Sequence, residues 1–433
     1  MSALLSLFPD ARQAFISDIF RFARVAGGEA RLVGGVVRNG LLARDKGVGF
    51  DVEQDLDFAV SLPIVRFAEV AQQKGLRVVE TGLAHGTVTV MADGQSAEVT
   101  QLRSDLSTDG RHAKIQPTSD WQTDAKRRDF TINALYLDAD GVIHDLVGGY
   151  SDLKVGCLRF VGDAARRLQE DHLRLLRALR FLACYPELSM PASDQKALAA
   201  HINLLPALSA ERVAAELRRL MDGPAALAVL CQAADTGIDE VLFGTHFSTV
   251  VLASELLAEL WWDLSFAQRL ACCLPQGMRA LGAERLKLSR VEQRFLARAD
   301  RLAGSAIKAK LLGPHWARSA YYLGDVAFLH ALQAAVYSEH SGKWPAQNTE
   351  DQAAQLRQIV SFQPPPCPIS GRDVEQRLGL SGPAVGACLD HLGELWAETD
   401  FTATKDQLLA RFAHKYSQHK ECDNKNIDRD EGR

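Results

Sequence analysis

Asp55 and Asp57 lie two residues apart in a run, residues 54–60, that alternates polar and apolar side chains. This alternation predicts a half-buried strand over residues 55–60. Side chains at i and i+2 of a strand point to the same face, so both carboxylates are expected to project together. Two like charges held this close are costly unless a cation lies between them, and oxygen ligands of this kind suit Mg²⁺. The pair is a candidate metal site, although an isolated pair of this kind is also common on exposed strands.

A pair of glycines, Gly34 and Gly35, follows an apolar stretch about twenty residues earlier in the chain. Glycine has no Cβ, so such a turn can bring backbone N–H groups close to phosphate oxygens. Taken alone, a Gly-Gly pair is more often an ordinary turn. Together with the two carboxylates, it indicates metal-dependent chemistry on a nucleoside triphosphate.

The composition is that of a soluble globular protein rather than a membrane protein. The chain has 433 residues, with 47% hydrophobic and 24% charged residues and a net charge of −5, which predicts two to four domains. It contains no apolar run near the ~20 residues that a membrane span needs. The eight cysteines are scattered without a C-x-x-C pair, which favours neither a disulfide framework nor a zinc site and predicts a cytoplasmic protein.

The order of residue patterns along the chain predicts a mixed α/β region followed by helices. Residues 28–150 contain strand-like segments at 30–33, 55–60, 77–80, 87–91, 97–102 and 134–137. From about residue 165 to 345 the apolar residues recur with helical spacing. The proline-rich residues 362–368 predict a linker, and a small helical module is expected after them.

Basic residues are concentrated in one part of the helical half. Residues 279–310 contain nine basic and three acidic side chains, a local net charge of +6 in an acidic protein. One interpretation is an ordinary solvated helix face. The other is a surface that follows the phosphates of an RNA.

Three further groups of polar residues complete the candidate site. Glu98 is expected on a neighbouring strand, where it could be a third metal carboxylate. Arg128 and Asp129 follow in a second polar run. In the third group an acid and three arginines recur every three residues, as on one face of a helix, at Asp171, Arg174, Arg177 and Arg180.

The third group can recognise a nucleotide, because a carboxylate accepts hydrogen bonds and a guanidinium donates them. An Asp–Arg pair can therefore mimic the Watson–Crick edge of a base, and further arginines can neutralise a triphosphate. In isolation the same spacing is more typical of a surface salt-bridge ladder. Its position after the other motifs favours the nucleotide interpretation.

In this order, over about residues 30–220, the motifs resemble those of the class II tRNA nucleotidyltransferases, the CCA-adding enzymes of the nucleotidyltransferase/poly(A) polymerase superfamily. Residues 370–373 and 396–412 resemble the alphaproteobacterial branch. The resemblance implies catalytic carboxylates at Asp55, Asp57 and Glu98, of which Asp55 and Asp57 would hold Mg²⁺. It implies nucleotide-binding residues at Gly35, Arg38, Arg128, Asp129, Asp171, Arg174, Arg177 and Arg180.

The implied fold class is α+β, with a nucleotidyltransferase head of mixed sheet and helices followed by an all-α neck, body and tail. The expected boundaries are a catalytic head at 1–152, a neck with base-recognition helices at 153–225, a tRNA-binding body at 226–362, a helical tail at 363–416 and a disordered end at 417–433.

The implied function is template-independent addition of CCA to the 3′ end of tRNA from CTP and ATP, by two-metal nucleotidyl transfer. Alternatives of the same class are an A-adding or CC-adding half-enzyme and a poly(A) polymerase. The polar segment 105–115 matches a flexible loop that a CC-adding enzyme lacks, which favours CCA or A addition. The alternative of a different class is a catalytically silent RNA-binding protein. No membrane partner is expected.

Two departures from the family pattern affect the expected site. Asn39 follows Arg38 where the family usually has Asp, so the side chain keeps its hydrogen-bonding capacity but loses the charge that could orient Arg38. The spacer before Asp55 is longer than usual and contains a second acidic pair, Asp51 and Glu53. We prefer Asp55 and Asp57 as metal ligands because Phe58 and Ala59 follow them, as in the family.

Overall fold

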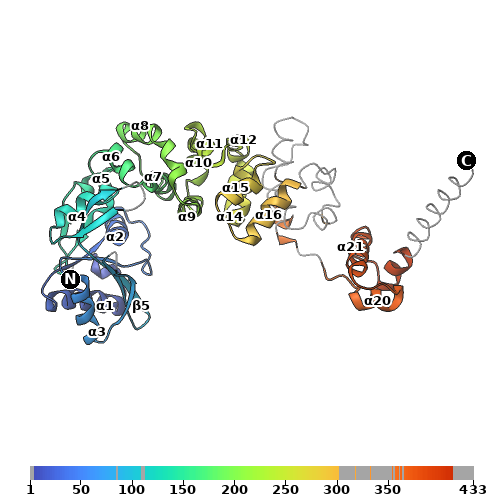
Figure 1. Ribbon diagram of the computed structural model, residues 1–433, viewed down its shortest axis with the longest axis horizontal. Coiled ribbons are helices and arrows are strands. Elements are labelled where there is room, and N and C mark those ends of the chain that lie inside the picture. Colours follow the sequence, from blue (N-terminus) through green and yellow to red (C-terminus); the bar gives the residue numbers. More distant parts are fainter. Residues whose placement is uncertain are drawn as a thin grey trace, which may run out of the picture. The chain divides into compact units, whose positions relative to one another are not determined.

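The computed structural model describes residues 4–83, 86–108, 113–301 and 365–412, together with positions 317, 332, 354, 356–359 and 361–362. The chain divides into two compact units, Met1–Gly244 and Thr245–Arg433 (Figure 1). The domain boundaries expected within these units stay predictions, and the expected disordered end lies outside the described residues.

The first unit is built on a seven-stranded mixed sheet with the strand order β3-β4-β5-β2-β1-β8-β9. Only the β2–β5 pair is parallel among these neighbours. The strands are β1 (Ala30–Val33), β2 (Asp57–Val60), β3 (Arg77–Gly82), β4 (Thr87–Ala92), β5 (Gln95–Gln101), β8 (Leu135–Leu137) and β9 (Ile143–Asp145).

The sequence predicted six of these strands to within a few residues and missed the short β9. The prediction for residues 55–60 was wrong at its start, because β2 begins at Asp57 and Asp55 precedes it. The polar segment 105–115 was expected to be a loop, but it contributes to a separate two-stranded sheet of β6 (Arg103–Thr108) and β7 (Ala113–Pro117). Residues 109–112 of that segment lie outside the described residues.

The two faces of the sheet are covered by different helices. The apolar side chains of α1 (Asp10–Val25) recur with helical spacing, and Phe20 meets Phe58 of β2 edge to face. Helix α3 (Ile64–Gln73) packs beside α1, and α2 (Gly35–Lys46) packs on β1 and β8.

The opposite face of the sheet, which carries Ala59, packs against α4 (Trp121–Arg127) through Ala125 and Tyr136. Residues i and i+2 of a strand share a face. Asp57 therefore lies on the α4 side of the sheet, opposite α1.

The rest of the first unit is helical. It contains α5 (Gly149–Val155), α6 (Ala164–Glu170), α7 (Leu173–Cys184), α8 (Ala192–Ala200), α9 (Ala210–Met221), α10 (Ala226–Asp235) and α11 (Ile238–Phe243), and the short 3₁₀ turns η3 (Thr131–Asn133) and η4 (Ile202–Ala207). Helix α7 packs against α9 and α10. A mixed-sheet head followed by helices confirms the predicted α+β class.

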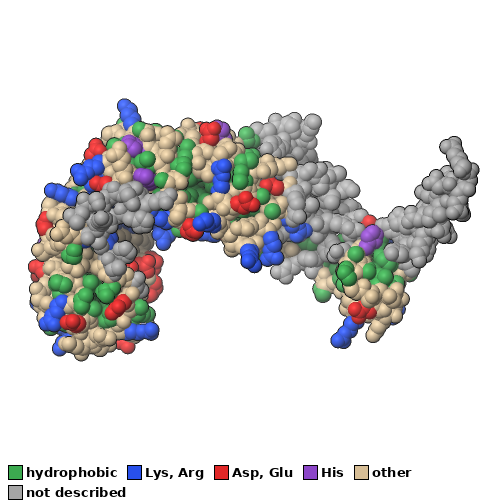
Figure 2. All heavy atoms as spheres, in the orientation of Figure 1, with side chains coloured by type: hydrophobic (Ala, Val, Ile, Leu, Met, Phe, Trp, Pro, Cys, Tyr) green, Lys and Arg blue, Asp and Glu red, His purple; other side chains and the backbone are tan. Residues whose placement is uncertain are grey.

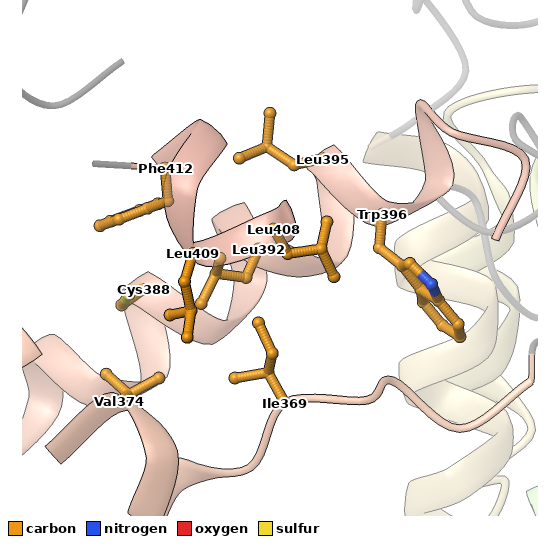
Figure 3. Close-up of a cluster of buried hydrophobic side chains, with 9 residues drawn as sticks. All are labelled: Ile369, Val374, Cys388, Leu392, Leu395, Trp396, Leu408, Leu409 and Phe412. Carbon is orange, nitrogen blue, oxygen red and sulfur yellow. The ribbon is translucent and has the colours of Figure 1, made fainter. Parts of the chain in front are cut away.

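The second unit is helical over its described residues. It contains α12 (Thr249–Leu252), α13 (Glu255–Leu260), α14 (Phe266–Cys273), α15 (Arg279–Arg285), α16 (Arg290–Arg301), α20 (Gly371–Leu378) and α21 (Pro383–Ala397). A capping box formed by Ser370 and Asp373 starts α20. Figure 3 shows the apolar cluster of this last part, in which Val374, Leu392 and Leu408 are fully buried. None of the described helices is both long enough and apolar enough to cross a bilayer.

The close approach of α7 and the segment after α9 depends on Gly223. A Cβ at this position would lie 2.5 Å from the carbonyl carbon of Ala183 and 2.8 Å from the backbone nitrogen of Cys184. Backbone atoms cannot move aside as a flexible side chain can, so the contact requires glycine.

We predict that Gly223→Ala lowers the free energy of unfolding by about 1–3 kcal/mol, the usual cost of forcing atoms into a packed interior. Thermal or urea unfolding of the full chain measures this change. Gly49→Ala is the matched control, because a Cβ at Gly49 meets nothing within 4 Å. Equal stabilities of the two variants would contradict the close approach.

Candidate active site

The parallel pairing of β2 and β5 places Asp57 directly beside Glu98. Registered neighbours in a sheet point to the same face, so the two carboxylates lie side by side. Asp55 lies just before the strand and is exposed, as is Glu98, whereas Asp57 is half-buried. Asp55 precedes the strand, although its charge acts on Asp57, and the pairing of β2 with β5 adds Glu98 beside Asp57.

The electrostatics of this carboxylate cluster show the cost of keeping it together. Burial raises the pKa of Asp57 to about 6, and the charges of Glu98 and Asp55 add to the effect. The charge of Arg128 opposes the shift. Such a cluster gains from a cation that neutralises it, and its oxygen donors suit a hard divalent ion. Within the described residues no group of three or more His, Cys, Asp or Glu side chains is arranged so that it could hold a metal ion.

The glycine turn lies between these carboxylates and a buried arginine. Gly34 has a φ of 78°, and a Cβ built on it would lie 3.9 Å from Oδ2 of Asp57. A Cβ on Gly35, the first residue of α2, would lie 3.7 Å from Nη2 of Arg38. The turn therefore lies close to both the Asp57 carboxylate and the Arg38 guanidinium.

Arg38 is almost completely buried, with 5% of its surface exposed. It donates to Asn39 Oδ1 from Nε at 3.1 Å and to the Tyr185 hydroxyl at 2.5 Å, and it also donates to Asn133. Burial lowers the pKa of Arg38, against the effect of Tyr185. The guanidinium is held in place by uncharged side chains.

Arg128 is oriented by two residues that the sequence argument missed, Asp124 and Tyr136. Arg128 donates to Asp124 Oδ2 at 3.1 Å and to the Tyr136 hydroxyl at 3.1 Å. Tyr136 in turn donates to Asp124 at 2.8 Å. These partners raise the pKa of Arg128 although burial alone would lower it. The i, i+4 spacing of Asp124 and Arg128 is the sequence signal that could have identified this pair.

Asp129 points to a different part of the site and pairs with Arg177 of α7 at 2.8 Å. Asn133 and the backbone N–H of Phe130 also donate to this carboxylate. Burial alone would raise the pKa of Asp129, but Arg177 and these hydrogen bonds bring it down to about 2. The pair ties the head to α7.

The third motif does not form one helical face, which corrects the prediction. Helix α7 begins at Leu173, after Asp171, whose backbone is extended. Arg174 donates to Glu170 at 3.1 Å and to the backbone carbonyls of Arg127 and Arg167 at 2.8 and 2.9 Å. The predicted i+3 spacing holds for Arg174, Arg177 and Arg180, which all lie on α7, and fails for Asp171, which lies between the end of α6 and the start of α7.

The acid of this motif and its last arginine pair with α9. Asp171 accepts from Arg212 at 3.0 Å, and Arg180 pairs with Glu216 at 3.2 Å. The sequence analysis gave no role to Arg212 or Glu216. Their i, i+4 spacing on a helix was the available signal.

Part of the predicted basic segment is exposed in the second unit. Arg285, Lys287, Arg290 and Arg294 are exposed on or beside α15 and α16, whereas Arg279 is fully buried. Lys308 and Lys310 lie outside the described residues. Figure 2 shows charged side chains of both signs on the visible face of the protein, so the net charge of −5 does not form a single acidic surface.

Known proteins resemble this chain over most of its length. Residues 30–159 match the Poly A polymerase head domain family. The mitochondrial CCA tRNA nucleotidyltransferase 1 of Mus musculus is 30% identical over 405 residues, which cover 88% of this chain and 86% of that protein. The corresponding Homo sapiens protein is also 30% identical, with the same two shares covered.

This chain belongs to the CCA tRNA nucleotidyltransferase family.

A solved CCA-adding enzyme of Bacillus stearothermophilus in complex with CTP has the same fold, with a TM-score of 0.71 and 24% identity over 94% of this chain and 98% of that chain. Membership in the nucleotidyltransferase family implies the use of a divalent metal. The chemistry of the Asp57 and Glu98 carboxylates suits such an ion, because a cation would offset the burial and the like charge that raise the pKa of Asp57.

We predict that Asp57→Asn stabilises the metal-free protein at neutral pH, because it removes one of the repelling charges. The cost of ionising Asp57 is absent below its ordinary pKa of 3.8 and complete above about 6, so wild-type stability should fall, relative to the variant, as the pH rises through this window. The gain should be about 2–4 °C in Tm for each kcal/mol of relieved repulsion.

Calorimetry in a chelating buffer at pH 5 and pH 8 checks this expectation. The Tm of Asp57→Asn should exceed that of the wild type by more at pH 8 than at pH 5. Glu69→Gln, which removes an exposed charge on α3, is the control. A variant that is less stable than the wild type at pH 8 would show that the cluster is not repulsive.

Proposed function

We propose that this member of the family adds C, C and A to the 3′ end of tRNA, using CTP and ATP and no nucleic-acid template. One observation carries the proposal: the Gly34–Gly35 turn lies close both to the carboxylate of Asp57, which Glu98 flanks, and to the buried guanidinium of Arg38. A metal-bound triphosphate needs a site for the cation and, close to it, a site for the negative charge of the phosphates. The family membership over most of the chain supports the same conclusion.

The carboxylates would hold Mg²⁺ through Asp55 and Asp57, with Glu98 beside them. When bound, the ion would supply Lewis-acid activation of the attacking 3′-hydroxyl and neutralise the triphosphate. Gly35 and Arg38 would contact the triphosphate, and Arg128 and Asp129 would bind near its phosphates and ribose. The protein would contribute positioning and charge stabilisation without a covalent intermediate.

Base recognition would fall to Asp171 and Arg174, with Arg177 and Arg180 in support. In the nucleotide-free chain the donors and acceptors of this pair are occupied by Arg212, Glu170 and backbone carbonyls. Reading a base edge would therefore exchange these protein hydrogen bonds for hydrogen bonds to CTP or ATP. Such an exchange favours CTP and ATP, whose bases share an exocyclic amino donor beside an acceptor ring nitrogen, over UTP and GTP, which carry a carbonyl acceptor beside a ring N–H donor.

The exposed basic side chains around α15 and α16 would contact tRNA phosphates. Arg290 and Arg294 line a groove together with Gln293 and Glu284. Phosphate contacts of this kind position an RNA without reading its sequence. We also propose that the chain works in the cytoplasm, because the seven cysteines in the described part are free thiols, as expected in a reducing compartment.

Nucleotide incorporation by the purified protein with Mg²⁺ tests the proposed function. We expect tRNA transcripts that end before CCA, after C and after CC all to be completed when CTP and ATP are present. Growth of only the CC-ended transcript by A would identify an A-adding half-enzyme, and growth that stops after CC would identify a CC-adding one. No incorporation on any transcript would overturn the proposal and favour a silent RNA-binding protein.

We predict that Asp55→Ala lowers incorporation at least about 100-fold, because an electrostatic group at the reacting phosphate is lost. Binding of tRNA, measured by gel shift, should stay near the wild-type value. Glu69→Ala, on an exposed part of α3, is the control. Retained incorporation would contradict the metal role of Asp55 and direct attention to Asp51 and Glu53.

We predict that Asp171→Ala lowers the preference for CTP and ATP over UTP and GTP by about 5- to 150-fold, the range for one bidentate base contact. Single-turnover incorporation with each nucleotide measures the preference. Glu187→Ala removes an exposed carboxylate of the same unit and should leave it unchanged. An unaltered preference in Asp171→Ala would rule out base reading by this residue.

A further inference from the structure

Asn39 hydrogen-bonds both to Arg38 and to Gln54, the residue that precedes Asp55. Its Oδ1 accepts from Arg38 Nε at 3.1 Å, from Arg38 Nη2 at 3.0 Å and from the Tyr185 hydroxyl at 3.2 Å. A guanidinium has donors and no acceptor, so the oxygen of the Asn39 amide must face it. The nitrogen of the same amide then faces the other way and donates to Gln54 Oε1 at 2.8 Å.

Gln54, which directly precedes Asp55 in the chain, makes further hydrogen bonds. Its Nε2 donates to the backbone carbonyl of Asp51 at 2.8 Å. Its own backbone carbonyl accepts from the buried Arg12, which also donates to Gln95 at 2.8 Å. Three contacts therefore fix the residue that is peptide-bonded to Asp55.

Arg38 differs from the neighbouring arginines in the charge of its hydrogen-bond partners. Arg174, Arg177 and Arg180 each pair with a carboxylate. In the part of the chain that the structure describes, the hydrogen-bond partners of Arg38 are neutral, and its guanidinium lies over the rings of Phe181 and Tyr185 at 5.0 and 4.7 Å. Asn39 thus orients the guanidinium without neutralising it.

We propose that Asn39 and Gln54 are positioning residues, an amide pair that fixes the spacing between the triphosphate-binding Arg38 and the metal-binding Asp55 and Asp57. The inference rests on the proposed function and deepens it. The neutral side chain at position 39 adds no negative charge beside Arg38, so it does not compete with the triphosphate, and its N–H group holds the long spacer at Gln54. Asn39 stands where the family usually has Asp, and Gln54 accepts a hydrogen bond that the amide of Asn39 can donate and a carboxylate cannot.

A carboxylate at position 39 cannot reproduce this arrangement. Asp has no donor for Gln54 Oε1, and Gln54 could satisfy it only by turning its amide and giving up the Asp51 carbonyl. The new negative charge would also lie on Arg38, where it competes with phosphate. Asn39→Asp should therefore weaken triphosphate binding, although Asp is the usual residue of the family at this position.

Four variants of the full chain test the amide pair: Asn39→Ala, Gln54→Ala, the double variant and Asn39→Asp. Direct binding of CTP by calorimetry, and kcat and KM for CTP on a tRNA transcript, are the measurements. Each alanine variant should lose at least about 3- to 10-fold in kcat/KM, the effect of the lost hydrogen bond between Asn39 and Gln54. The double variant should be no worse than the more impaired single variant, because Gln54 acts on Arg38 only through its hydrogen bond to Asn39.

Two readouts separate positioning from a merely structural role. Asn39→Asp should lower the affinity for CTP about 3- to 10-fold with little change in Tm, and Gln54→Ala should raise the Mg²⁺ concentration for half-maximal rate. Asn203→Asp and Gln73→Ala make the same chemical changes at exposed positions and should behave as the wild type.

Additive losses in the double variant, or unchanged CTP affinity in Asn39→Asp, would overturn the amide pair while wild-type incorporation stands. A wild type that binds CTP but incorporates nothing would overturn the proposed function, and coupling between the variants in CTP binding would still support the pair. A wild type that does not bind CTP would overturn both.

Discussion

The parallel pairing of β2 with β5 is the constraint on which the site depends. It holds the half-buried carboxylate of Asp57 beside Glu98, with Asp55 two residues earlier in the chain. Burial and like charge both make this arrangement unfavourable, and the raised pKa of Asp57 records the cost. The packed sheet offsets that cost, because Phe58 and Val60 of the same strand are completely buried. Stability of the strand is thus used to keep a repulsive cluster in place.

The arginines around this cluster are held in two different ways. Arg128 and Arg177 are fixed by the buried carboxylates of Asp124 and Asp129, and Asp124 also pairs with Arg127. Arg38 is fixed by amides, a phenol and two aromatic rings, which orient a guanidinium without cancelling its charge. An anionic ligand can interact strongly with Arg38, because the hydrogen-bond partners of Arg38 among the described residues are neutral and a buried charge attracts an opposite charge strongly.

Several particular features of the fold could be predicted from local sequence, and others could not. The strands at residues 30–33 and 87–91 could be predicted from short strand-like segments. The helical half could be predicted from the helical spacing of its apolar residues. The start of β2 at Asp57 could not be predicted, because polar alternation continues into a loop. The interruption between α6 and α7 was also hidden, because the i+3 spacing of Asp171 and Arg174 is compatible with either one helix or two.

The sequence by itself determined the residue types of the site and their order, from the glycine turn through the carboxylates to the last arginine, because those types carry the chemistry. It also determined the α+β class, because strand and helix periods are local properties. Only the tertiary structure decided which groups meet. The Asp57–Glu98 and Asn39–Gln54 contacts depend on strand order and on the path of a long spacer. Distances between residues remote in sequence are set by packing of the whole unit, which no local pattern encodes.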